Sequence, residues 1–423
     1  MTRAAHPPGP PGTVDLAELP NLLEPLRRWA VEYGDVVRFV TTDGEECYSV
    51  CAPELADHVL RRNHRNYTRG YGVERVRLML PGGLLVDDGE RWLRHRTLAQ
   101  PLFHRRTVAG LAELSHRQAR AIRDEWIARV RTGAPLDVTA GTSQFALGCI
   151  VEALLGAQPP GGHPFLGLAG DLTRDLAFAR RFRGLRQATG ALLDRRAAAA
   201  AAEPDLLAML LGARDAASEP PTRDELIDAV LTVLVAGHET TATALTWIWV
   251  LLAQHPEAEA RLHRELDAAR AGGAGDAELL ALPYLGQVID EALRLYPPVW
   301  LATRRAIAAD RIGDFDIGAG AQVFIPLAVV LRHPRLWDHP DAFLPERFAA
   351  DAPARHPLAY LPFGAGPRRC IGEHLAVLDL RCHVAHVASA LAFRLSDPAA
   401  VDIDPQVNLR PRGRVTMTGR IRA

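Results

Sequence analysis

Apolar residues recur at helical spacing over most of the chain between residues 22 and 295. An interval of three or four residues places such side chains on one face of a helix. The longest run begins at a capping box, Thr222-Arg-Asp-Glu225, and stays apolar to about Gln254. It predicts a helix of about 33 residues, roughly 50 Å long, which is far above the usual helix length. A shorter helix is predicted from Leu285 to Leu295, ended by Pro297-Pro298.

Period-two alternation, which is typical of strands, is confined to short segments. These are Val36–Thr41, Cys47–Cys51, Arg311–Ile317, Gln322–Pro326 and the stretch near Arg412–Gly419. The sequence therefore predicts a mainly α fold with small β-sheets at its edge.

Candidate breaks in the pattern are short and lie between helical segments. They are Gln158–His163, Ser218–Pro221 and Ala271–Gly275, and each is expected to be a turn within one domain. The Ala-rich run Ala197–Ala202 favours a helix end. We expect a Pro-rich lead-in over residues 1–12 and a single domain over residues 13–423.

Composition narrows the function. The 49 basic residues, all Arg, are matched by 50 acidic residues, so nothing attracts the chain globally to nucleic acid or anionic lipid. Five Cys argue against a disulfide framework and favour a reducing compartment, the cytoplasm. No uninterrupted apolar stretch of about 18 residues appears, so no membrane anchor is expected.

The most informative segment is Phe363-Gly-Ala-Gly-Pro-Arg-Arg-Cys-Ile-Gly372. Cys370 lies in a Gly-rich loop directly before an apolar helical pattern, and a helix N-terminus lowers a thiol pKa. Three chemistries use one activated Cys. A cysteine protease or transferase would use His374 as base. A zinc site would use Cys382, His383 and His386, and haem iron would take the thiolate alone.

The long predicted helix carries polar residues in its middle, Val233-Leu-Val-Ala-Gly-His-Glu-Thr-Thr-Ala242. Burying Glu239 and the adjacent Thr residues without partners would destabilise the fold. Either this turn faces solvent or it forms a polar kink against a ligand.

The loop segment fits Phe-x-x-Gly-x-Arg-x-Cys-x-Gly and so resembles the haem loop of the cytochrome P-450 haem-thiolate monooxygenases. The resemblance implies that Cys370 is the iron ligand, with Phe363, Arg368 and Gly372 contacting haem. The long helix is similar to the family's oxygen-binding helix. There Ala236 and Gly237 would line the groove with room for oxygen, while Glu239 and Thr240 would relay protons.

Other motifs occur in the family's order from about Gly12 to Gly419. Glu291 and Arg294 resemble the Glu-x-x-Arg pair of the family. In the family this pair joins a further Arg to brace the haem loop, and Arg347, within Pro345-Glu-Arg-Phe348, matches that residue. Trp92 and Arg96 look like haem-propionate donors. Arg304 matches a further propionate ligand, although the adjacent Arg305 competes for that role. The stretch 158–219, where the family's substrate-roofing helices should lie, carries no motif.

The resemblance implies a single triangular P-450 domain with haem b between the long helix and the Cys loop. The implied reaction inserts one oxygen atom of O2 into a lipophilic molecule of terpene, fatty-acyl or polyketide type, in secondary metabolism. Alternatives are a peroxygenase, a rearrangement enzyme or a non-catalytic haem sensor.

Electrons would come from NAD(P)H through a ferredoxin reductase and ferredoxin, because no flavin or iron–sulfur segment is visible. A basic docking face would comprise Arg94, Arg105, Arg106 and Arg369. The expected substrate pocket is apolar and comprises Leu84, Leu85, Val86, Val299, Trp300 and Ala302.

Overall fold

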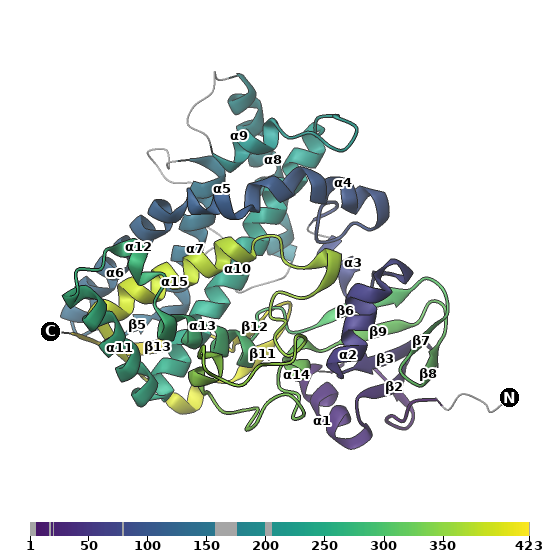
Figure 1. Ribbon diagram of the computed structural model, residues 1–423. Helices are drawn as coiled ribbons and strands as arrows, with labels where there is room; N and C mark the ends of the chain where they lie inside the picture. Colours follow the sequence, from purple (N-terminus) through teal and green to yellow (C-terminus); the bar gives the residue numbers. More distant parts are fainter. Residues whose placement is uncertain are drawn as a thin grey trace.

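The computed structural model describes residues 6–16, 18–19, 21–77, 80–156, 176–198 and 205–422. The predicted turn at Gln158–His163 and most of the Ala-rich run lie outside these residues. Helices occupy one side of the molecule and most strands the other (Figure 1).

The helices are α1 (Leu23–Tyr33), α2 (Pro53–Asp57), α3 (Val73–Arg77), α4 (Gly89–Ala99), α5 (Arg105–Ala109), α6 (Ala112–Arg131), α7 (Val138–Leu155), α8 (Leu176–Ala198), α9 (Leu206–Leu211), α10 (Arg223–Gln254), α11 (Pro256–Ala271), α12 (Asp276–Leu279), α13 (Pro283–Leu295), α14 (Leu327–Val330) and α15 (Glu373–Ala390). The strands are β1 (Thr13–Val14), β2 (Val36–Thr41), β3 (Glu46–Val50), β4 (Tyr67–Arg69), β5 (Leu136–Asp137), β6 (Ala302–Ala306), β7 (Asp310–Ile312), β8 (Phe315–Ile317), β9 (Gln322–Ile325), β10 (Leu391–Leu395), β11 (Ile403–Pro405), β12 (Leu409–Pro411) and β13 (Thr416–Ile421).

Helix α10 confirms the prediction of one very long helix. Its capping box is complete: the Thr222 hydroxyl accepts from the Glu225 N–H at 3.3 Å, and the Glu225 carboxylate accepts from the Thr222 N–H at 2.8 Å. Almost every apolar side chain of α10 beyond its first turn is buried. A helix that is apolar on all sides belongs in a core, which explains both its length and its composition.

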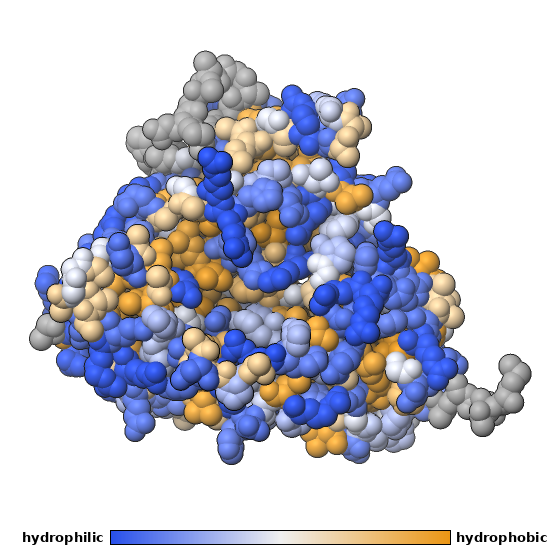
Figure 2. Space-filling view, viewed as in Figure 1, coloured by the Kyte–Doolittle hydropathy of each residue, from blue (hydrophilic) through white to orange (hydrophobic). Residues whose placement is uncertain are grey.

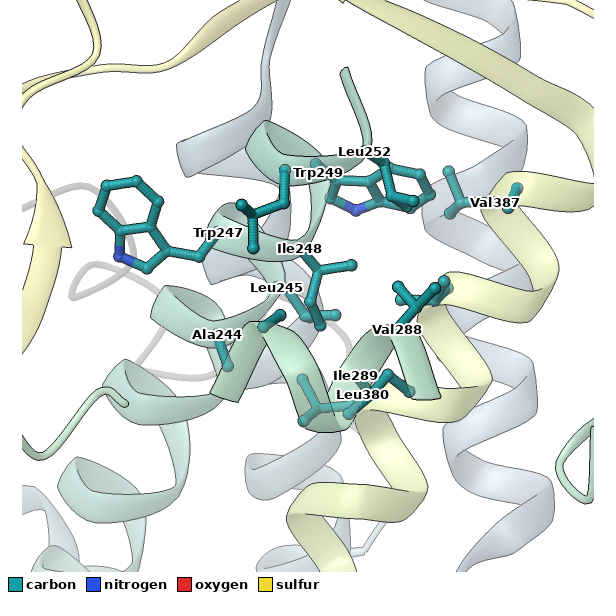
Figure 3. Packing of buried hydrophobic residues seen from close by; sticks show 14 of the residues in the cluster. Ala244, Leu245, Trp247, Ile248, Trp249, Leu252, Val288, Ile289, Leu380 and Val387 are labelled. Carbon is teal, nitrogen blue, oxygen red and sulfur yellow. The ribbon is translucent and has the colours of Figure 1, made fainter. Parts of the chain in front are cut away.

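The largest hydrophobic core surrounds the second half of α10. Figure 3 shows Trp249 and Ile248 of α10 facing Val288 of α13 and Leu380 and Val387 of α15. Helix α7 packs along the other side of α10, where the Thr142 and Thr246 hydroxyls are 2.9 Å apart. By length and composition α7 could also span a membrane, but it is mostly buried inside the protein, as a core helix would be.

The principal sheet has six strands in the order β1-β2-β3-β9-β6-β4. Strand β3 runs parallel to β9, and β4 pairs antiparallel with β6, so that Arg69 lies opposite Arg304. A second sheet has the order β10-β13-β5, and the pairs β7-β8 and β11-β12 form small ribbons.

The predicted bounds of the strands match the structure to different degrees. Strand β2 has the expected bounds, and β3 and β9 match to within a residue at each end. The segment expected as one strand over Arg311–Ile317 is instead the hairpin β7-β8, because Gly313 at φ +61° turns the chain. The C-terminal strand starts at Thr416, four residues later than expected.

Candidate active site

The Cys370 loop lies between a single 3₁₀ turn, η6 (Gly366–Arg368), and α15. The Cys370 N–H donates to the Phe363 carbonyl at 2.9 Å, which closes the loop. Gly366 has φ +72°, and a Cβ there would lie 2.0 Å from the Leu60 carbonyl oxygen. Only glycine satisfies both constraints, so the loop packs directly on the backbone of η1 (His58–Arg62).

Cys370 is exposed, whereas the other four Cys are buried. Burial is nevertheless the largest influence on the Cys370 thiol and raises its pKa, while the Gly372 N–H, Arg96 and Arg369 act in the opposite direction. Solvent therefore reaches the sulfur although protein atoms surround it closely, and its surroundings, which include Trp92, Arg96 and Arg368, are termed the recess. The N–H of Gly372, the N-cap of α15, is the helix-terminus donor expected from the sequence.

Helix α4 places Arg96 against this loop. Its guanidinium donates to the Arg369 carbonyl at 2.9 Å and to the Gln100 side chain at 2.8 Å. Trp92 lies one turn earlier, and the Arg368 guanidinium stacks over its ring at 4.6 Å from the centroid. The structure therefore brings Trp92, Arg96 and Arg368 to one place beside Cys370.

Three arginines form a second feature of the recess. Arg304 is buried, and burial, reinforced by Arg368, lowers its pKa to about 10. Burial likewise lowers the pKa of Arg69 to about 9, with Arg368 and Arg304 adding to the effect, and its Nε has no partner among the described residues. Arg368 forms an ion pair with Asp88. The three guanidinium groups therefore carry more positive charge than the carboxylate of Asp88 neutralises.

The sequence interpretation missed Arg69. The signal was weak, because Arg69 precedes Gly70 in a three-residue strand, and only the pairing of β4 with β6 brings it to Arg304. The pairing of β4 with β6 also distinguishes Arg304 from Arg305. Arg305 points to the opposite face, is partly exposed and pairs with Glu45, so Arg304 is the one in the recess.

The polar turn of α10 is helical throughout. The Thr240 hydroxyl donates to the Ala236 carbonyl, four residues earlier, at 2.6 Å. The Glu239 carboxylate accepts from the Asn408 amide at 3.0 Å, and Asn408 is buried. Glu239 and Thr240 thus both have partners within the protein.

Gly237 lies where α10 meets α7. A Cβ at Gly237 would lie 3.0 Å from Cγ1 of Ile150 on α7. The missing side chain therefore lets α10 and α7 pack closely, and the role of Gly237 toward oxygen stays a prediction.

Glu291, Arg294 and Arg347 meet as the sequence predicted. Arg294 donates twice to the Glu291 carboxylate, at 2.6 and 2.8 Å, and both side chains are fully buried. Arg347 donates to the same carboxylate at 3.2 Å, and so does the Leu344 N–H at 2.9 Å. The remaining Arg294 donors reach backbone carbonyls of the segment after α14, including Pro340 at 2.7 Å. The network fixes that segment to α13.

Comparisons with known proteins decide the family. The cytochrome P450 family model matches residues 177–416. Cyclooctatin synthase of Streptomyces melanosporofaciens is 33% identical over 91% of this chain and 87% of its own length. This chain belongs to the cytochrome P450 family.

Further relatives agree with this assignment. Cyclooctat-9-en-7-ol 5-monooxygenase of the same organism is 33% identical over 86% of this chain and 83% of its own length. The crystal structure of the cytochrome P450DA heme domain superposes with a TM-score of 0.88 at 23% identity, covering 99% of this chain and 97% of that one. The protein is a cytochrome P450 monooxygenase with the P450 fold, a haem cofactor and external electron donors.

The residues present fit a haem. A flat ligand with two carboxylates matches a recess that has an accessible thiol and surplus guanidinium groups. The buried Nε of one of them, Arg69, has no partner in the part of the chain that the structure describes. This P450 therefore has charge and ligand chemistry of the required kind on its own side chains.

The competing uses of Cys370 lose support in this P450. His374 is exposed, and its Nε2 accepts from Arg105 at 3.2 Å, so it is committed to another group. Cys382, His383 and His386 lie buried on α15, beyond the helix end that carries Cys370.

The residues of the predicted substrate pocket differ in their surroundings. Trp300 packs in a core cluster with Phe324 and Leu409, and its indole N–H donates to the Gln406 carbonyl at 2.8 Å. It supports the sheet. Val86 is fully buried, while Val299 is 45% exposed. Leu84, Leu85 and Ala302 are partly buried.

The predicted basic face of this P450 is smaller than expected. Arg94 forms ion pairs with Asp215 and Glu225 at the start of α10, so its charge is used internally. Arg369 pairs with Glu373 at 2.6 Å. Arg105 and Arg106 on α5 remain exposed.

Proposed function

We propose that this P450 oxidises a lipophilic, terpene-like molecule in secondary metabolism, using haem b held by Cys370. The observation that carries the proposal is the thiol of Cys370, exposed in the recess beside Arg96. The relative that acts on cyclooctat-9-en-7-ol, by its name a cyclic alkenol, supports this substrate class. Figure 2 shows orange, hydrophobic side chains gathered left of centre on one face, among blue, hydrophilic ones.

The recess would bind the cofactor through ionic contacts. Haem supplies the oxygen chemistry when bound. Arg69, Arg304 and Arg368 would hold its two carboxylates, and Trp92 and Arg96 would complete the rim. Planar guanidinium forks suit this role because each can donate two parallel hydrogen bonds to a carboxylate.

Glu239 and Thr240 would supply protons. Asn408 holds the Glu239 carboxylate at one oxygen, and this orientation would keep the group poised beside Thr240. The Thr240 hydroxyl donates to the Ala236 carbonyl in this structure. During turnover it would rotate and donate instead toward the haem side of α10. Glu291, Arg294 and Arg347 would act only as supports that keep the Cys370 loop in place.

Electrons would arrive from NAD(P)H through a ferredoxin reductase and a ferredoxin. Arg105 and Arg106 on α5 are exposed, and Arg105 contacts His374 at the start of α15, close to Cys370 in sequence. An acidic ferredoxin would be steered to such a patch. Reduction of this P450 by the ferredoxin should be fastest at low salt. The double variant Arg105→Glu with Arg106→Glu should slow this reduction about tenfold or more. The control Arg311→Glu, on the exposed β7-β8 hairpin, should leave the rate unchanged.

The haem assignment is tested by the reduced, carbonyl-bound spectrum of the purified protein. We expect the long-wavelength Soret band of thiolate-ligated haem, and its loss in Cys370→Ser. The control Cys51→Ser, a buried Cys next to Ser49, should keep the band. A histidine-type band in freshly folded wild-type protein would overturn the assignment.

The substrate class is tested by spin-state titration. Cyclic terpene alcohols should shift the haem spectrum at micromolar concentration, and fatty acids of equal carbon number should not. If only fatty acids produce the shift, the substrate proposal is wrong while the haem assignment stands.

A further inference from the structure

Ligand-type side chains from three helices meet in a second place, remote from Cys370. They are His116 of α6, Asp276 of α12, and Cys382 and His386 of α15. Figure 1 shows these three helices together at one end of the molecule. His386 lies 13 residues after the first residue of α15, about 20 Å along the helix from the end near Cys370.

The separations suit a small tetrahedral ion. His116 Nδ1 lies 3.0 Å from His386 Nε2 and 3.6 Å from Cys382 Sγ, and Asp276 Oδ2 lies 3.7 Å from His386 Nε2. Zinc bonds of about 2.0–2.3 Å in tetrahedral geometry place ligand atoms about 3.3–3.6 Å apart. These three separations differ from that geometry by a few tenths of an ångström, and Cys382 Sγ would move closer to the other ligand atoms on binding.

The surroundings keep both imidazoles neutral, as metal ligands must be. Burial lowers the pKa of His386 to about 4, opposed by Asp276, and burial also lowers the pKa of His116. Nδ1 of His386 has no partner among the described residues, so this ring can carry its proton there and direct the Nε2 lone pair into the cluster.

Asp276 has the outer contacts expected of a ligating carboxylate. Its Oδ1 accepts from Arg270 at 2.8 Å, and its Oδ2 accepts from Arg120 at 2.6 Å. Hydrogen bonds of this kind orient a metal-bound carboxylate. Arg120 also pairs with Glu113 at 2.5 Å, which offsets part of the positive charge near the cluster.

A hydrogen bond between His116 and His386 alone would explain their 3.0 Å separation, but it does not explain two further contacts. Cys382 is fully buried with its sulfur directed at His116, and Asp276 directs an oxygen at His386. Burial raises the pKa of the Cys382 thiol, so the group keeps its proton until a cation displaces it.

We propose that His116, His386, Asp276 and Cys382 form a binding site for one Zn²⁺ ion. The ion would pin α6, α12 and α15 together and release the thiol proton on binding. Because the site is separate from the haem recess, its test does not depend on the haem assignment.

The experiment uses the purified haem-containing protein, treated with chelator and then dialysed against Zn²⁺. We expect about one zinc per protein chain by elemental analysis. Co²⁺ in place of zinc should give tetrahedral visible bands and a near-ultraviolet thiolate charge-transfer band. His386→Leu should weaken zinc binding by more than the ~10–100-fold typical of losing an outer contact.

The matched control is His374→Gln, an exposed histidine on the same helix, which should bind zinc as the wild type does. Cys382→Ser should keep tetrahedral Co²⁺ bands and lose the charge-transfer band, which tests the site even if His386→Leu fails to fold. Wild-type protein that binds no zinc above the level of His386→Leu would overturn the proposal. So would a Co²⁺ spectrum without thiolate character.

Discussion

Replacing Glu291 with Gln tests the buried network that fixes the segment after α14. The substitution keeps the side-chain shape but removes the charge that two arginines share. Arg294 is fully buried, so its guanidinium would lose its bidentate partner without gaining water. Arg347 and the Leu344 N–H would each lose a charged acceptor as well.

The expected loss is about 3–5 kcal/mol, the usual effect of removing one partner of a buried pair. Unfolding entropy of roughly 2.1 cal/mol/K per residue gives about 0.9 kcal/mol/K for a chain of this length. The melting temperature should therefore fall by about 3–6 °C. Urea unfolding followed by circular dichroism measures the free energy, and a thermal scan measures the shift.

The control is Glu346→Gln, only one residue before Arg347. Glu346 pairs with Arg261 at 2.6 Å, but both side chains are about half exposed, so the loss should stay below about 1 kcal/mol. Arg294→Lys should behave like Glu291→Gln, because an ammonium cannot reproduce the fork or the contact with the Pro340 carbonyl. Equal losses in Glu291→Gln and Glu346→Gln would refute the reasoning.

Three further predictions address protons and charge. Thr240→Ala should release more hydrogen peroxide per NAD(P)H and lower product formation about 10²-fold, and unchanged coupling would exclude Thr240 from proton delivery. Burial raises the pKa of Asp379 to about 7, so the folded protein holds a proton that the unfolded chain loses near pH ~4. Stability should therefore fall as pH rises from about 4 to about 7, and urea midpoints of Asp379→Asn should lack that component. Arg69→Gln should speed haem transfer to apomyoglobin about tenfold or more by removing one charge-assisted contact, whereas equal rates would place Arg69 outside the haem site.

Local signals in the sequence predicted local structure well. The bounds of α10 follow from a capping box at Thr222 and from His255-Pro256 at its end, both of which act within one helical turn. Strand β2 was likewise readable from alternation alone, because one face of it meets the core. The hairpin β7-β8 was not, since its turn depends on the single residue Gly313.

The chemistry of the haem loop was also carried by neighbouring residues. Cys370, Arg368 and the loop glycines lie within ten positions of one another, so their order already specifies a thiol at a helix N-terminus. Glu291 and Arg294 are one helical turn apart, and their pairing needs only the helix.

Contacts between distant segments could not be read in this way, because they depend on how the elements pack. Arg69 meets Arg304 through the register of β4 on β6, and that register makes Arg304 rather than Arg305 the residue of the recess. Gly237 faces Ile150 because of the rotation of α10 against α7.

Cys370 and Cys382 show the same difference between contacts that the sequence predicts and contacts that depend on packing. The sequence alone indicated Cys370 as a reactive thiol, because its loop and helix end are contiguous. It offered Cys382 and His386, with His383, only as further ligands for a zinc site that would use Cys370. Their partners, His116 and Asp276, lie more than a hundred residues earlier in the chain and reach the cluster only when α6 and α12 pack against α15. Side-chain burial on folding, and not proximity in sequence, brings those four groups together.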